Sequence, residues 1–264
     1  MRKAGIFVLI FLCSIPLVAH DLFLRSRPFI LPGPGSVVLS MWLAEAFPGK
    51  EQKWRADKTV SAAVNGSTGY RKLNVTGTAP EIPLNQAGTF VIGWESRPSY
   101  IKIDAAAFAI YLEADGYMNV IEIRKKRGEE SKEGTERYVR YLKALVQVGS
   151  QRTEHYKDPF GFKIELIPSS NPYSTKIGGP LELQLFFDGK PLVGAKVLAT
   201  YEGFSEEHDV YAQSLQSGPD GKFKVIIDHP GLWMVRANYM LPLAGDSKAE
   251  WESFWANLTF EIPG

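Results

Sequence analysis

Short apolar segments separated by turn signals fill the C-terminal part of this 264-residue chain. Each segment has about five to eight residues, the usual length of a strand. The segments are residues 162–167, 181–187, 195–201, 222–227, 232–238 and 255–262. Turns that contain proline or glycine separate them, at residues 171–172, 188–191, 220–221 and 229–231. This series of short strands, without a helical pattern, predicts an immunoglobulin-like β-sandwich over residues 159–264.

Strand and turn signals also alternate in the N-terminal part of the chain. Residues 22–30 and 36–43 are predicted strands, and the prolines and glycines between them cannot continue a strand ladder. Further β-prone runs and turns follow between residues 59 and 94. Asn65-Gly66 is a strong tight-turn signal, because both residues tolerate positive φ. We therefore predict a first β-sandwich domain over residues 20–158.

The pattern becomes helical after Asp104, which is a good N-cap for the alanine-rich segment that follows it. Gly116 ends this helix, and a second helix is predicted over residues 118–127. These helices form a short insertion in the first sandwich, at about residues 104–127, and a charged loop is expected over 129–137. The expected fold class is mostly β, with two β-sandwich domains, of which the second is immunoglobulin-like.

Residues 1–19 have the pattern of a signal peptide. Arg2 and Lys3 precede an apolar run that is shorter than the ~20 residues needed to span a membrane, and cleavage is predicted after Ala19. Cleavage there would remove Cys13, the one cysteine of the chain, and with it disulfides, thiolate metal ligands and cysteine nucleophiles. We predict a periplasmic or secreted protein with no membrane span after cleavage.

The charge and the motifs of the chain exclude several classes of function. The formal charge is +1, and removal of residues 1–19 with their two basic residues gives +1 − 2 = −1. A nearly neutral chain lacks the basic character expected for nucleic-acid binding. The sequence contains no Gly-x-Ser-x-Gly elbow, phosphate-binding loop or His-Glu-x-x-His motif. We therefore expect no enzymatic activity and no nucleic-acid partner.

Cleavage after Ala19 would make His20 the N-terminal residue. Its α-amine and imidazole could then close a chelate ring on a metal ion. Of the other histidines, His208 is the first choice for a second imidazole because three acidic residues flank it, and His155 and His229 follow. We predict a metal site at His20, Asp21 and His208, whose nitrogen ligands suit nickel or copper, whereas the lack of thiolate disfavours a structural zinc site. In the alternative, His20 only starts the first strand and His208 lies on a solvated loop.

A set of motifs extends over nearly the whole mature chain. They are Ala19-His20-Asp21-Leu22-Phe23-Leu24, Pro32-Gly33, Phe47-Pro48-Gly49, Asn171-Pro172-Tyr173, and residues 136–149, 189–195, 220–223, 230–233 and 251–256. In this order they resemble the bacterial exported family called domain of unknown function 4198 (DUF4198). The resemblance implies a periplasmic protein associated with nickel or cobalt uptake.

Three functional hypotheses follow. The first is an exported, non-enzymatic binding protein for a divalent transition metal, nickel or cobalt by resemblance and copper by chemistry, which acts in uptake or homeostasis with envelope or metal-transport components as partners. The second is a structural or protein-interaction module of the cell envelope that binds no metal. The third is a copper oxidase with a histidine brace at His20, which would produce peroxide from oxygen and a reductant.

Overall fold

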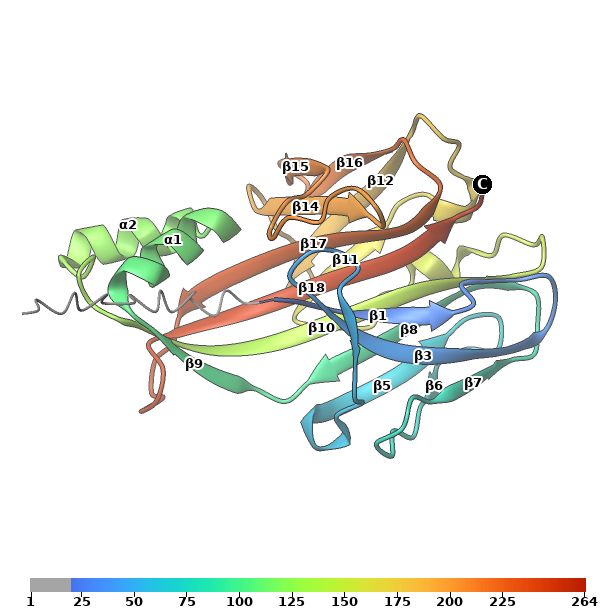
Figure 1. The fold of residues 1–264 in the computed structure, drawn as a ribbon, viewed down its shortest axis with the longest axis horizontal. Coiled ribbons are helices and arrows are strands. Elements are labelled where there is room, and N and C mark those ends of the chain that lie inside the picture. The colour runs from blue at the N-terminus through green and yellow to red at the C-terminus, as the bar shows by residue number, and fades with distance from the viewer. Residues whose placement is uncertain (1–19) are drawn as a thin grey trace, which may run out of the picture.

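The computed structural model describes residues 20–264, and the predicted signal peptide with its cleavage site lies outside this range. The described chain is mostly β, as expected, and its strands form three sheets. No helix among these residues is long and apolar enough to cross a membrane. Figure 1 shows long strands that extend along the molecule and two helices at one end.

Two smaller sheets lie on either side of a large one. Sheet A consists of β1 (Asp21–Arg27), β3 (Gly35–Ala44), β4 (Lys50–Gln52) and β7 (Glu81–Leu84). Sheet C consists of β11 (Ile164–Pro168), β12 (Gly179–Phe187), β13 (Lys190–Pro191) and β16 (Lys222–Ile227). Short 3-10 helices occur at Ala56–Lys58, Glu154–Lys157 and Pro172–Ser174.

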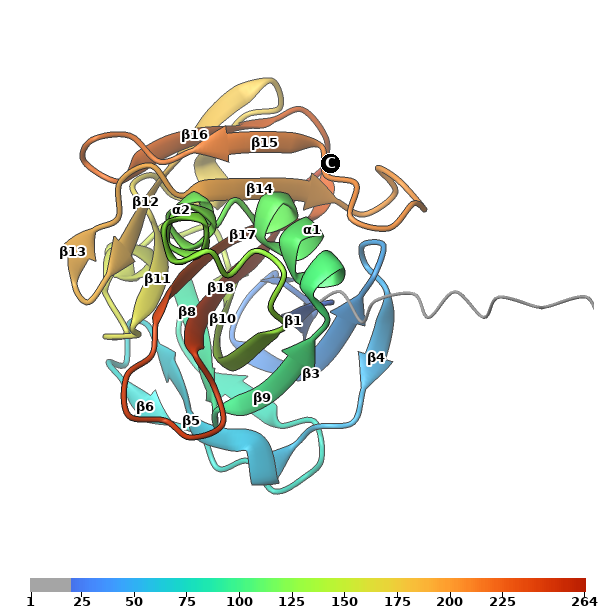
Figure 2. The same ribbon diagram turned by 90° about the vertical axis from the view of Figure 1, so that its left-hand side faces the viewer.

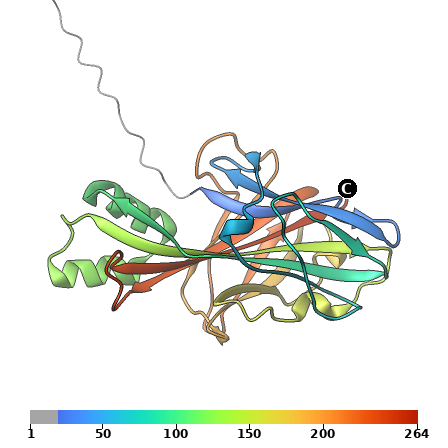
Figure 3. The same ribbon diagram turned by 90° about the horizontal axis from the view of Figure 1, so that it is seen from below.

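Sheet B is the large central sheet. Its strands, in spatial order, are β15 (Gln213–Gln216), β14 (Lys196–Tyr201), β17 (Gly231–Pro242), β18 (Trp251–Ile262), β10 (Gly134–Val148), β8 (Gly88–Ser96), β5 (Thr59–Asn65) and β6 (Arg71–Lys72). Two further strands, β2 (Ile30–Leu31) and β9 (Ser99–Ile103), also pair with β10. The strands β10 and β18 are parallel neighbours and extend through most of the molecule (Figure 3).

Alternate side chains of β10 enter two different cores, because successive residues of a strand point to opposite faces. Leu142, Ala144 and Val146 pack in the core that contains the residues of sheet A. Val139 and Tyr141 pack in the core that contains the residues of sheet C. Two sandwiches therefore share sheet B, and strands from both sides of the predicted boundary at residues 158 and 159 pair within it.

The two predicted helices are present as α1 (Ala105–Asp115) and α2 (Met118–Arg127). The Asp104 carboxylate accepts a hydrogen bond from the Ala107 amide at 2.9 Å, and Gly116 ends α1 with a left-handed φ of 75°. Figure 2, viewed from this end, shows the helices in front of the central strands. Their apolar side chains share a third core with Trp251 and Trp255 of β18.

The predicted loop over residues 129–137 is wrong in its last part, because β10 begins at Gly134. Residues 134–138 pair with β9 on one side, and Glu136 onward pairs with β18 on the other. A charged sequence is therefore held in a strand by partners that are remote in the chain.

Candidate functional site

Two of the predicted site residues, His20 and His208, lie on either side of Glu45. The Nε2 atom of His20 is 3.2 Å from Glu45 Oε1, and the Nε2 atom of His208 is 3.3 Å from Glu45 Oε2. The side chains of His20, Glu45 and His208 are 26%, 51% and 62% exposed, so solvent reaches all three. The fold thus gathers two imidazoles and a carboxylate at one surface site.

Strand register and a tethered loop bring these residues together. Asp21 of β1 pairs with Ala44 of β3, so the next pair outward places His20 opposite Glu45. His208 lies in the loop over 202–212, between β14 and β15, and the amide of Asp209 in this loop donates a hydrogen bond to the Glu45 carbonyl at 3.1 Å. Glu45 carries no local signal in the sequence, because only the pairing of β1 with β3 connects it to His20.

The third predicted residue, Asp21, lies in the interior. Its Oδ1 accepts a hydrogen bond from Arg236 Nη1 at 3.1 Å, and its Oδ2 accepts one from the Tyr211 hydroxyl at 2.7 Å. Burial raises the pKa of the Asp21 carboxyl even though the Arg236 guanidinium beside it acts in the opposite direction. The structure therefore gives Asp21 two protein partners on the inner side of the site, and its role as a metal ligand stays a prediction.

Arg236 of β17 connects two buried carboxylates. It also donates to Asp115, the last residue of α1, and Asn238 donates to the other oxygen of Asp115 at 3.1 Å. Burial alone would lower the pKa of Arg236, but the two carboxylates beside it hold that pKa well above its usual value. A cavity of about 410 Å³ lies over this network, and Asp209 and Tyr211 are among its lining residues.

Glu136 of β10 forms a second buried polar cluster, under the helices. Its Oε1 accepts hydrogen bonds from the Ser253 hydroxyl and, at 3.2 Å, from the Tyr111 hydroxyl, whereas its Oε2 is buried without a partner. Burial raises the pKa of the Glu136 carboxyl to about 7, although both hydroxyls favour its charged form.

The remaining histidines have other partners. His155 Nδ1 lies 2.9 Å from Asp158 Oδ2, and the His229 ring stacks on Tyr201 at a centroid distance of 4.5 Å. Among residues 20–264, no three histidine, cysteine, aspartate or glutamate side chains already form a group spaced to hold a metal ion.

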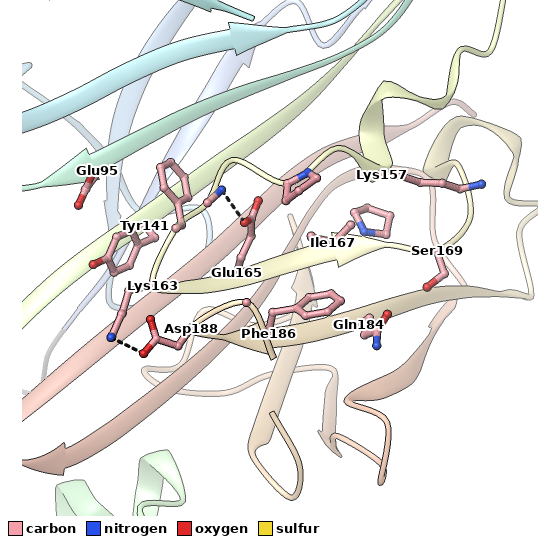
Figure 4. Close-up of a pocket in the computed structure, with 15 residues that line it drawn as sticks. Glu95, Tyr141, Lys157, Lys163, Glu165, Ile167, Ser169, Gln184, Phe186 and Asp188 are labelled. Carbon is pink, nitrogen blue, oxygen red and sulfur yellow. Dashed lines mark hydrogen bonds and ion pairs between the residues drawn. The ribbon is translucent and has the colours of Figure 1, made fainter. Parts of the chain in front are cut away.

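A larger cavity, of about 770 Å³, lies beside β11 and β12 (Figure 4). Tyr141, Phe162 and Phe186 supply aromatic walls. Lys163 and Asp188 form an ion pair at 2.6 Å at its edge, as Figure 4 shows. The cavity thus combines aromatic faces with charged groups, which is a common composition of binding pockets.

The fold and the site define a mostly β protein of two sandwiches that share a central sheet, with a histidine–glutamate surface site above a buried charge network. The chain belongs to the DUF4198 family, a domain of unknown function, whose model matches residues 17–241. This match confirms the family that the motifs suggested. A search of curated proteins finds no significant match.

A search of solved structures lists matches of low sequence identity and low TM-score. The D0-D1 domain of intimin is 10% identical, covers 91% of this chain and 97% of its own, and has a TM-score of 0.22. The three N-terminal domains of the outer capsid protein Hoc of bacteriophage RB49 are 8% identical and cover 93% of this chain and 59% of theirs, with a TM-score of 0.22. The Bacteroides ovatus protein SGBP-B, in complex with a mixed-linkage heptasaccharide, is 12% identical and covers 89% of this chain and 42% of its own, with a TM-score of 0.17.

Proposed function

We propose that the protein is exported to the cell envelope and there binds a divalent transition metal, nickel, cobalt or copper, through His20, Glu45 and His208, without catalysing a reaction. The observation that carries this proposal is the position of Glu45, whose two carboxylate oxygens lie 3.2 and 3.3 Å from the two imidazoles. These residues come from three segments that are far apart in the sequence, and their side chains must turn from their present positions before all three can share one ion.

The donor set suits such an ion. Ligand atoms that share a metal at about 2.1 Å lie roughly 3.0 to 3.4 Å apart, which is the separation found on each side of Glu45. All three side chains are partly exposed, so they can turn onto a common ion. In this arrangement His20 binds through Nε2, the ring nitrogen that faces Glu45. If cleavage follows Ala19, a chelate formed by the α-amine and Nδ1 would be a different arrangement, because the two nitrogens of one imidazole ring point away from each other and cannot bind the same ion.

Calorimetry on correctly processed protein tests this proposal. The protein is exported with its own signal, its N-terminus is confirmed by mass spectrometry, and it is titrated with nickel, cobalt and copper. We expect one-to-one binding that weakens at least about tenfold in His20→Ala and in His208→Ala, because each change removes a nitrogen ligand. His229→Ala is the matched control, because its ring stacks on Tyr201. Equal affinity in all four proteins would contradict the proposal.

The copper-loaded sample also distinguishes binding from oxidation. We expect no peroxide above the level of a chelated-copper blank when oxygen and ascorbate are supplied. Sustained peroxide production that His20→Ala abolishes would instead favour the copper oxidase.

The aromatic cavity favours a second candidate, an interaction module of the envelope that binds a glycan. Phe162 and Phe186 are half-buried and offer ring faces on which a sugar can pack. Titration with envelope oligosaccharides would then give binding that Phe186→Ala abolishes and His20→Ala leaves unchanged. No binding to any of them would remove this candidate.

A further inference from the structure

A separate cavity, of about 470 Å³, lies between sheet A and the strands β8, β9 and β10. Its apolar lining comes from Leu22, Met41 and Leu43 on one side and from Trp94 and Tyr138 on the other. The volume is within the usual range for sites that hold small organic molecules. The cavity therefore offers room and apolar surface for such a ligand.

The charges that line this cavity are all positive. The lining contains five basic side chains and no acidic one, namely Lys53, Arg55, Lys58, Arg97 and Arg140. Arg55 is paired with Asp57 through hydrogen bonds of 2.9 and 2.7 Å. For the other four basic side chains, no carboxylate oxygen of residues 20–264 lies within 4.0 Å, the longest distance counted as an ion pair. This concentration of unpaired cations contrasts with the nearly neutral chain.

The surroundings of Arg140 are the strongest indication that this cavity binds an anion. Its guanidinium packs over the rings of Tyr138 and Trp255 at 5.0 and 5.6 Å, and its Nη2 donates to the His20 carbonyl at 3.2 Å. Its Nε is buried and has no hydrogen-bond partner.

Polar groups beside Arg140 complete the site. Ser96 accepts a hydrogen bond from the Arg140 amide at 2.8 Å, and Lys58 donates to Ser99 at 3.3 Å. Both serines line the cavity. Their hydroxyl protons add donors to a site in which the guanidinium and ammonium groups are donors only.

We propose that this cavity binds a small organic anion, in which a carboxylate or phosphate group meets Arg140 and Arg97 and an apolar body lies against Trp94 and Met41. A guanidinium matches the two oxygens of such a group. The site adjoins the histidine–glutamate site through the hydrogen bond from Arg140 to the His20 carbonyl, but it uses other side chains and does not depend on a metal ion.

Calorimetric titration with four probes tests this proposal. Benzoate and phenyl phosphate carry the anion on an apolar ring, inorganic phosphate carries the anion alone, and benzamide carries the ring without the charge. We expect the two aromatic anions to bind, inorganic phosphate to bind more weakly, and benzamide to show no binding. Tighter binding of inorganic phosphate than of phenyl phosphate would overturn the assignment to an organic anion.

Variants locate the binding. Arg97→Gln should weaken phenyl phosphate binding about tenfold, as expected for the loss of a charge-assisted hydrogen bond. Arg97 is exposed, so this variant folds even if Arg140→Met does not. Lys190→Gln, which removes an exposed positive charge on sheet C, should leave the affinity unchanged.

His208→Ala removes a proposed metal ligand that does not line this cavity, and the variant should still bind phenyl phosphate, so the two proposals can fail separately. The anion site is overturned if neither aromatic anion binds at millimolar concentration, if benzamide binds as tightly as benzoate, or if Lys190→Gln weakens binding as much as Arg97→Gln.

Discussion

At the scale of the residue, burial changes the acid–base chemistry of Glu136. Its pKa rises from 4.5 to about 7 in the folded protein, so the native state binds this proton more tightly than the unfolded chain does. The contribution of Glu136 to the free energy of unfolding is therefore fully present below pH 4.5 and is lost as the pH rises through 7. The full change amounts to about 3 kcal/mol at most.

Glu136→Gln should remove this pH dependence, because an amide stays neutral. We expect the variant to be about 1 to 3 kcal/mol more stable than the wild type at pH 8, and to differ less from it at pH 5. Urea unfolding at the two pH values measures this. Glu133→Gln is the matched control, since Glu133 is exposed and pairs with the exposed Lys102. A wild-type-like pH profile in Glu136→Gln would contradict this account.

A buried ion pair connects the N-terminal and C-terminal parts of the chain. Lys143 of β10 and Glu165 of β11 lie 2.9 Å apart, and their side chains are only 2% and 3% exposed. Lys143→Met should lower the free energy of unfolding by about 3 to 5 kcal/mol, because it leaves the Glu165 charge buried without its partner. Lys163→Met breaks the exposed pair with Asp188 and should cost less than about 1 kcal/mol. Urea unfolding measures both changes. Equal losses of unfolding free energy in the two variants would contradict the prediction that breaking the buried pair destabilises the protein more than breaking the exposed pair.

The sequence indicates site residues only where the chemistry is local. His20 follows a predicted cleavage site and His208 lies among acidic residues, and both of these signals are present in the sequence alone. Glu45 has no local signal, and its place at the site follows from the register of β1 with β3. Arg140 and Arg97 likewise belong to one cavity only because β10 and the end of β8 border it.

At the scale of the element, the helices were predictable from local signals, whereas the first residues of β10 were not. The N-cap at Asp104 and the glycines that end α1 and α2 are local signals, and the helices end at those glycines. The start of β10 depends instead on pairing with β9 and β18. No local pattern in the charged segment before Tyr138 indicates that it pairs with these strands.

Gly134 at the start of β10 allows the insertion to pack closely on the sheet. A Cβ atom added there would lie 2.4 Å from the ring of Phe108 in α1. Gly134→Ala should therefore lower the free energy of unfolding by about 1 to 3 kcal/mol, because the buried ring must shift. Gly33→Ala, where a Cβ atom would meet nothing within 4 Å, is the control. Thermal unfolding of both variants checks this, and an unchanged melting temperature for Gly134→Ala would refute the close packing.

At the scale of the whole molecule, the shared sheet B couples the two sandwiches. The predicted boundary at residues 158 and 159 separates β10 from β18, although these strands pair over nine residues, from Glu136 with Trp251 to Ala144 with Thr259. Compositional signals along the chain suggested the boundary, but such signals carry no information on parallel pairing between distant strands.

The isolated segment 159–264 should therefore not fold stably, because it would lack β10 and the core residues that β10 supplies. Residues 20–264 together should unfold in one cooperative transition. Circular dichroism and urea unfolding of both proteins measure this. A cooperative transition in the isolated segment, with a midpoint equal to that of the full chain, would show that it is an independent domain.

The most direct test of the proposed metal site is electron paramagnetic resonance of the copper-loaded mature protein. We expect hyperfine coupling to nitrogens of two imidazoles, with one imidazole contribution lost in His208→Ala and both kept in His229→Ala. A spectrum that is identical in the wild type and in His208→Ala would contradict the claim that the fold brings His20 and His208 together on one metal ion.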